Sequence, residues 1–138
     1  KEEKDKSMKM SERLNLYKDR QRNNLSENAY GAIVRLRMDN SHPLGFGYDK
    51  EYLSLKLRNR RYAYLESGWN VGTTQDSTSI VSGFVGFKAK QNFRESLVFG
   101  VEEIGRGSVV YMVDNPLFRG FWYNGKLLFG NAVFLVGN

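Results

Sequence analysis

The feature that most constrains the fold is a strand that ends abruptly and is followed by a final apolar segment. Ser108–Val113 is a short, mostly apolar run of a length typical of a buried strand. Asp114-Asn-Pro116 ends that strand, and helix-compatible apolar positions recur from Leu117 to the C-terminus. A strand, a polar break at its carboxyl end and a helix together form the unit from which α/β proteins are built. We therefore expect an α/β fold.

The residues before this unit predict a mostly β domain. Gly31–Met38 predicts a strand, because over its second half apolar Val34, Leu36 and Met38 alternate with Arg35 and Arg37, as on a strand with one buried and one wet face. Gly105–Gly107 makes a tight connection, so residues 96–102 and 108–113 should pair as an antiparallel hairpin. Further strands are expected at Tyr62–Glu66, Trp69–Gly72 and Ile80–Phe87, a short helix or irregular segment at Glu51–Leu57, and a helix from Ser11 to about Asn24.

The length of 138 residues indicates one domain or part of one. Residues 1–10 are charged and poor in bulky apolar groups, which predicts a disordered or flexible lead-in. Residues 11–138 are expected to form a single α/β domain, a mixed and mostly β sheet with flanking helices. An α+β arrangement is the alternative. We expect the domain to be the C-terminal part of a larger protein.

Composition excludes several kinds of chemistry. The chain has no cysteine, which excludes a disulfide, a thiolate zinc site, an iron–sulfur cluster and a cysteine nucleophile. The single histidine, His42, precedes Pro43 in a turn cluster, and no ligand spacing around it matches a zinc site. We interpret His42 as a turn or packing residue and expect no cofactor in this chain. No apolar run approaches the length of a membrane span, so no membrane partner is expected.

Two residues of the closing unit are candidates for ligand binding. Asp114 lies where a strand leaves the sheet, the usual position of sites in α/β proteins. Its carboxylate could equally cap the turn or the following helix, and this is the interpretation we favour. Arg119 lies among aromatic residues and could bind an anion. It could also pair with Asp114 and stack on a Phe or Trp ring, which is the favoured structural role.

The net charge of +6 is concentrated in residues 31–61, which hold seven Lys/Arg and three Asp/Glu. Lys56–Arg61 is flanked by tyrosines, and binders of single-stranded nucleic acid mix basic and aromatic side chains in this way. The basic run is short, however, and residues 62–138 carry no net charge. A solvated loop, or a surface that faces another domain, is favoured over a nucleic-acid site.

Six segments carry a resemblance to a known family. They are Gly31–Arg35, Ser41–Gly47, Ser82-Gly83, Gly105–Val110, Asp114–Trp122 and Lys126–Phe134. Together they resemble the C-terminal part of bacterial zinc carboxypeptidase-like proteins, over residues 12–137. In that family a metallocarboxypeptidase domain is followed by a domain similar to class I glutamine amidotransferases, which has a flavodoxin-like fold. Arg106 stands where the family pattern has Lys.

The resemblance implies a non-catalytic role. The peptidase zinc motif His-x-x-Glu and the amidotransferase cysteine are both missing here. The implied function is an accessory domain that packs on or orients the peptidase domain of the same parent protein, in the periplasm or outside the cell. Zinc is implied only for that peptidase domain, and the oligomeric state stays open.

Two other functions are considered. The first is a stand-alone binding module for anionic ligands or nucleic acid, which would use Arg35, Arg37, Arg58, Arg60, Arg61 and Arg119. The second, ranked last, is a cryptic hydrolase centred on His42 and Asp114.

Overall fold

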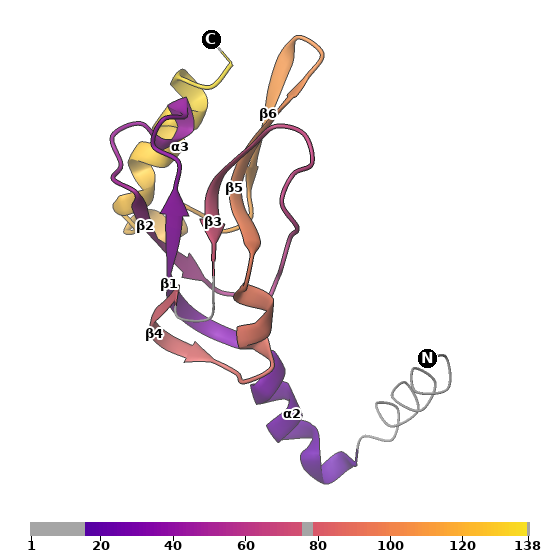
Figure 1. Cartoon of the computed structure of the whole chain (residues 1–138). Helices are drawn as coiled ribbons and strands as arrows, with labels where there is room; N and C mark the ends of the chain where they lie inside the picture. The colour runs from indigo at the N-terminus through magenta and orange to yellow at the C-terminus, as the bar shows by residue number, and fades with distance from the viewer. Residues whose placement is uncertain (1–15, 76–78, 138) are drawn as a thin grey trace, which may run out of the picture.

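One curled antiparallel sheet dominates the protein (Figure 1). The computed structural model describes residues 16–75 and 79–137, so the expected lead-in lies outside the described residues. The strands are β1 (Ala29–Met38), β2 (Glu51–Lys56), β3 (Trp69–Thr74), β4 (Ile80–Val85), β5 (Ser96–Ile104) and β6 (Gly107–Met112). The helices are α2 (Arg20–Glu27) and α3 (Asn124–Phe134), with short 3-10 turns at Tyr17–Asp19, Pro43–Gly45, Ala89–Phe93 and Phe118–Gly120.

The strands follow the order β2-β1-β3-β5-β6, with β4 also paired to β1, and every pairing is antiparallel. The expected hairpin is confirmed as β5 and β6, joined at Gly105, whose φ of 64° suits a residue without a side chain. The fold is therefore a sheet-dominated mixture of α and β, as expected. Flavodoxin-like sheets are parallel, and that part of the expectation is not confirmed.

The core is built mostly from side chains of the strands, to which the 3-10 turn Ala89–Phe93 and α3 add buried residues. The alternation in β1 is confirmed, because Val34, Leu36 and Met38 are buried and the two arginines between them are exposed. Tyr52 of β2 and Phe99 of β5 meet edge to face, with ring centres 5.3 Å apart. Leu128 of α3 is also fully buried in this cluster.

The chain from Leu44 to Tyr48 seats α3 on the core. The Tyr48 hydroxyl donates to the Asn124 carbonyl at 2.5 Å and accepts from the Leu128 N–H at 2.8 Å. These two groups would bond directly in a regular helix, so the hydroxyl is inserted into the first turn of α3. Further along α3, the Asn131 amide donates to both end carbonyls of Leu44–Phe46, at 3.1 and 2.7 Å.

The expectation of a short helix or irregular segment at Glu51–Leu57 is wrong, because residues 51–56 form β2. Tyr52, Ser54 and Lys56 are buried, and the residues between them are more exposed. Two polar side chains point inward and leucines lie on the other face. The strand period is therefore not visible as an alternation of hydrophobicity.

The expected strand at Tyr62–Glu66 is also wrong, since this segment is irregular. Its backbone groups find other partners. The Tyr62 carbonyl accepts from the Leu97 N–H at 2.9 Å, and both backbone groups of Leu65 bond the Asn70 amide, at 2.8 and 3.2 Å. A side-chain amide here takes the place that a neighbouring strand would have.

The two helices differ in how far the expectation can be compared with the structure. α2 spans Arg20–Glu27, and the expected start at residue 11 lies outside the described residues. α3 begins at Asn124 rather than near residue 117, because Arg119 and Gly120 have φ values of 50° and 70°, which a right-handed helix does not allow. Within the described chain no helix is long and apolar enough to cross a membrane.

Candidate functional site

Asp114 belongs to a buried ion pair that closes the sheet. One carboxylate oxygen lies 3.2 Å from the Lys56 ammonium nitrogen, and the other accepts from the Ser54 hydroxyl at 2.7 Å. The Lys56 side chain is wholly buried, and its ammonium nitrogen lies 5.4 Å from the centre of the Phe93 ring. Because β2 and β6 stand at opposite ends of the strand order, these bonds join the two ends of the curled sheet. Lys56 is thus not part of the basic surface run.

The favoured cap by Asp114 is wrong. The turn is held by Asn115, whose side-chain oxygen accepts from the Leu117 N–H at 2.9 Å. Arg119 does not pair with Asp114, whose charge partner is Lys56. The guanidinium carbon of Arg119 lies 5.2 Å from the centre of the Phe118 ring, which confirms the expected stacking of Arg119 on an aromatic ring. Ligand binding by Asp114 and Arg119 stays a prediction.

His42 holds a turn, as expected. Its Nδ1 accepts from the Leu44 N–H at 3.0 Å, so that Nε2 carries the ring hydrogen. The imidazole centre lies 5.4 Å from the Trp69 ring centre. Burial lowers the pKa of His42, and the charge of Asp39 opposes that shift, so the ring is neutral at pH 7. His42 and Asp114 line different hollows, and the structure does not bring this hydrolase pair together.

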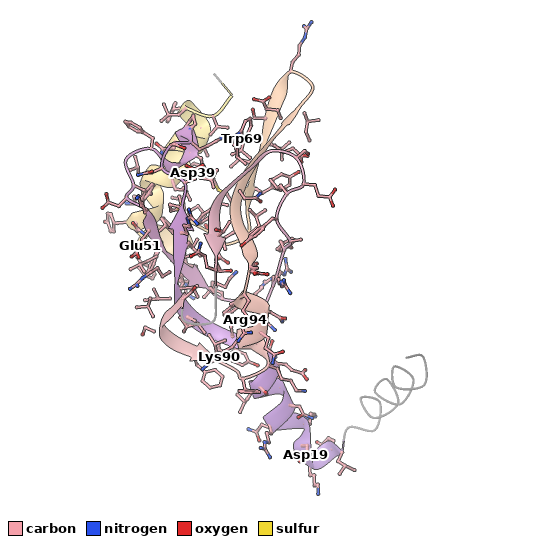
Figure 2. The ribbon with its side chains drawn as sticks, viewed as in Figure 1. Asp19, Asp39, Glu51, Trp69, Lys90 and Arg94 are labelled. Atoms are coloured by element: carbon pink, nitrogen blue, oxygen red, sulfur yellow. The ribbon has the colours of Figure 1, made fainter. Side chains whose placement is uncertain are left out.

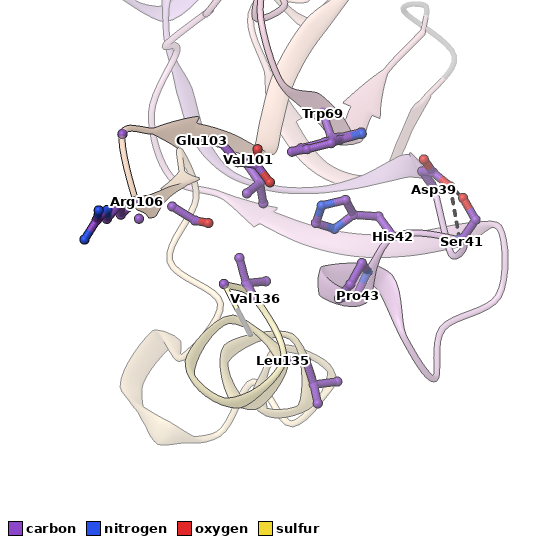
Figure 3. Close-up of a pocket in the computed structure, with 14 residues that line it drawn as sticks. Asp39, Ser41, His42, Pro43, Trp69, Val101, Glu103, Arg106, Leu135 and Val136 are labelled. Carbon is purple, nitrogen blue, oxygen red and sulfur yellow. Dashed lines mark hydrogen bonds between the residues drawn. The ribbon is translucent and has the colours of Figure 1, made fainter.

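The hollow that contains His42 opens where β3, the β5–β6 hairpin and the end of α3 meet (Figure 3). It has a volume of about 690 Å³, and we call it the mouth hollow. Figure 2 shows Trp69 and Asp39 at this end of the sheet, whereas Lys90 and Arg94 lie at the other end. The lining of the mouth hollow consists of Asp39, Ser41, His42, Pro43, Trp69, Val101, Glu103, residues 105–108 and residues 135–137.

Two carboxylates, Asp39 and Glu103, flank the mouth hollow from opposite sides (Figure 3). The Asp39 Oδ1 accepts from the hydroxyl of Ser41 at 2.5 Å and from its N–H at 3.0 Å. These bonds, with a smaller contribution from nearby positive charge, hold the pKa of Asp39 below its usual value. Asp39 is therefore ionised at neutral pH.

A second hollow, of about 700 Å³, shares Asp39 and contains Arg37 and Lys50. We call it the basic hollow. Neither Arg37 nor Lys50 belongs to an ion pair of the described residues. The ion pairs in this part of the chain join Arg35 to Glu51, Lys56 to Asp114 and Lys88 to Glu27.

The six arginines proposed for a binding module do not converge on one site. Arg35 pairs with Glu51 at 3.4 Å, and Arg35 and Arg37 line a further hollow of about 440 Å³, which shares Arg37 and Lys50 with the basic hollow. Arg58 and Arg60 line a smaller hollow beside Asp114. The hollow that contains Arg35 and Arg37 therefore differs from the one that contains Arg58 and Arg60.

α3 leaves an apolar face in solvent, which we call the outer face of α3. Leu127, Phe129, Val133 and Phe134 on this face are between 43 % and 73 % exposed. Between them a side chain at Gly130 would meet no atom within 4 Å. Gathered apolar side chains of this kind are typical of contact surfaces.

The comparisons with known proteins give no relative. No family model, no curated protein and no solved structure matches the chain significantly. No group of three or more His, Cys, Asp or Glu side chains that could hold a metal ion occurs among the residues that the structure describes.

Sequence reasoning missed several of these residues. Trp69 and Glu103 gave no signal, because the hollow that they line is formed by segments far apart in the chain. Asn131 did give one, since it is an amide inside an otherwise apolar helix. It connects two of the segments that carry the resemblance, Ser41–Gly47 and Lys126–Phe134.

Proposed function

We propose that this chain is a non-catalytic accessory domain of a bacterial zinc carboxypeptidase-like hydrolase. It packs on or orients the peptidase domain of the same protein, in the periplasm or outside the cell. Zinc belongs to that peptidase domain, and this chain corresponds in the proposal to the class I glutamine amidotransferase-like domain that follows it. The resemblance of the closing segments supports the family.

The observation that carries the accessory role is the outer face of α3. A helix that is apolar on all sides is normally buried. The inner face of α3 is buried through Leu128 and Asn131, yet Val133 and Phe134 are 54 % and 73 % exposed. The helix has one charged residue, Lys126, whose ammonium nitrogen lies 3.7 Å from the centre of the Tyr123 ring. This face suits a second protein surface better than water.

The polar groups first considered for catalysis support the same role. The Asp114 carboxylate is bonded to Ser54 and Lys56, and the His42 Nδ1 is bonded to a backbone N–H. Each of these hydrogen bonds stabilises the fold.

The test uses the full-length product of the gene that encodes this chain. We expect an upstream domain with a His-x-x-Glu motif, and we expect Val133→Ser to lower the affinity of the separated peptidase domain for this domain by at least about tenfold. Val81→Ser on β4 is the matched control, because Val81 is 49 % exposed and lies away from α3. Equal effects of the two substitutions, or an upstream region without such a domain, would overturn the proposal.

A second candidate, a stand-alone module for anionic ligands or nucleic acid, is favoured by one observation. Arg37 and Lys50 line the basic hollow without belonging to an ion pair of the described residues. Titration with inorganic phosphate and with single-stranded DNA at two salt concentrations tests it. Binding that is lost in Arg37→Gln and kept in Arg106→Gln would support this function, and no binding at low salt would remove it.

A further inference from the structure

We propose that the mouth hollow binds the cationic group of an ammonium or guanidinium compound, of the kind that lysine and arginine side chains carry. The protein as a whole is basic, with a net charge of +6, yet the groups around this hollow favour positive charge. Carboxylates, an indole face and a helix end all contribute to this preference.

The carboxylates are the first contribution. Glu102 and Glu103 are neighbours on β5, and successive side chains of a strand point to opposite faces. Glu102 is bonded to the hydroxyls of Ser67 and Tyr111, away from the hollow, whereas Glu103 lines it. Across the hollow stands Asp39, whose Oδ1 is held by Ser41 and whose Oδ2 takes part in neither of those bonds.

Trp69 is the second contribution. Its ring lies over the hollow with the His42 imidazole below it, and it is 44 % exposed (Figure 3). The face of an indole attracts cations more strongly than the face of any other side chain. The C-terminal end of α3 also borders the hollow through Leu135 and Val136, and a helix C-terminus carries partial negative charge.

The remaining lining suits the stem of a basic side chain. Val101 and Val136 offer an apolar wall along which methylene groups can lie. His42 is neutral and presents an Nε2–H donor, which fits a carbonyl group near the cation. Arg106, the basic side chain in this lining, points away from the hollow in Figure 3. A basic residue of a peptide meets all these groups together.

The test is an NMR titration of the intact chain with N-acetyl-arginine amide and, separately, with n-butylamine. Both compounds should shift the Trp69 indole N–H signal in a saturable way, at concentrations up to about 20 mM. Trp122 supplies an internal control, because its indole N–H is bonded to the Leu53 carbonyl at 3.3 Å outside this hollow. Sodium acetate should leave the Trp69 signal unchanged. A stronger response to the arginine compound than to the amine would identify a peptide side chain as the source of the cation.

Substitution of the adjacent glutamates makes the result specific. Glu103→Gln should weaken binding at least about fivefold, while Glu102→Gln should change it by less than about twofold. Glu103 is exposed, so the variant should keep the fold, which the rest of the spectrum reports. Equal effects of the two substitutions, no shift of Trp69 with either cation, or a shift with acetate would each overturn the proposal.

Discussion

Removing the Asp114 carboxylate tests whether its pair with Lys56 stabilises the closed sheet. Asp114→Ala leaves an ammonium group that is 0 % exposed and has lost its counter-charge. At 3.2 Å the direct attraction is roughly 5 kcal/mol for an effective dielectric constant of about 20. Breaking such a pair from one side costs about 3–5 kcal/mol, a large part of the total stability of a domain. Asp114→Asn should cost less, about 2 kcal/mol, because the amide oxygen can still accept a hydrogen bond from the Lys56 ammonium, although the counter-charge is lost.

The free energy of unfolding should be measured in urea, with tryptophan fluorescence as the signal. The exposed pair of Lys88 with Glu27 is the matched control. Its nitrogen and oxygen are 2.9 Å apart, but the two side chains are 58 % and 55 % exposed. Glu27→Ala should therefore cost less than about 1 kcal/mol.

The double variant Lys56→Met/Asp114→Leu tests whether the lone buried charge is the cause of the loss. It removes both charges, with a side chain of similar size at position 56 and one of the same branched shape at position 114, so its free energy of unfolding should lie within about 1 kcal/mol of the parent. The reasoning is refuted if Asp114→Ala costs no more than Glu27→Ala. It is also refuted if the double variant is as unstable as Asp114→Ala, because burial of a lone charge would then not be the cause.

Three further predictions concern α3 and His42. Gly125→Ala should lower the free energy of unfolding by about 3 kcal/mol, because its Cβ would lie 1.9 Å from the Pro116 carbonyl oxygen. Gly130→Ala should raise the free energy of unfolding by about 0.5–1 kcal/mol, because the space around Gly130 is open. Urea unfolding of both variants checks the contrast. Tyr48→Phe should cost about 1–2 kcal/mol and speed hydrogen exchange at the first turn of α3, and unchanged exchange there would contradict the inserted hydroxyl. NMR titration of His42 should give a pKa below 6.5, and Asp39→Asn should lower it further, since the carboxylate favours the charged ring. Because the folded pKa of this base is depressed, its contribution to stability is complete above pH 6.5 and is lost as the pH falls toward the folded value; a pKa above 6.5 would contradict the burial of the ring.

The sequence predicts those parts of the fold in which local pattern and tertiary burial agree. β1 is visible because its apolar residues face the core, and the β5–β6 hairpin is visible because glycines mark its turn. β2 is not visible, because the ion pair with Asp114 draws Ser54 and Lys56 inward and leaves leucines outside. An alternation of hydrophobicity cannot reveal a strand whose buried face is polar.

The role of Asp114 could not be predicted for a related reason. The sequence shows that Asp114 follows a strand, and local capping is the simplest use of a carboxylate at that position. Its partners, Ser54 and Lys56, lie 60 and 58 residues away, so only the curl of the sheet brings them into reach. The mouth hollow has the same origin, since its lining comes from four distant segments of the chain, at residues 39–43, at Trp69, at residues 101–108 and at residues 135–137.

The hydroxyl of Tyr48 in the first turn of α3 has a consequence for the order in which the domain assembles. An isolated helix of 11 residues with two glycines is not stable in water. Its first turn is completed by the Tyr48 hydroxyl, 76 residues earlier in the chain, so the segment that contains Tyr48 must be in place before the helix can form. During synthesis the sheet and this segment emerge before the helix. We therefore expect α3 to join last, as the step that converts an open, partly folded sheet into the finished domain.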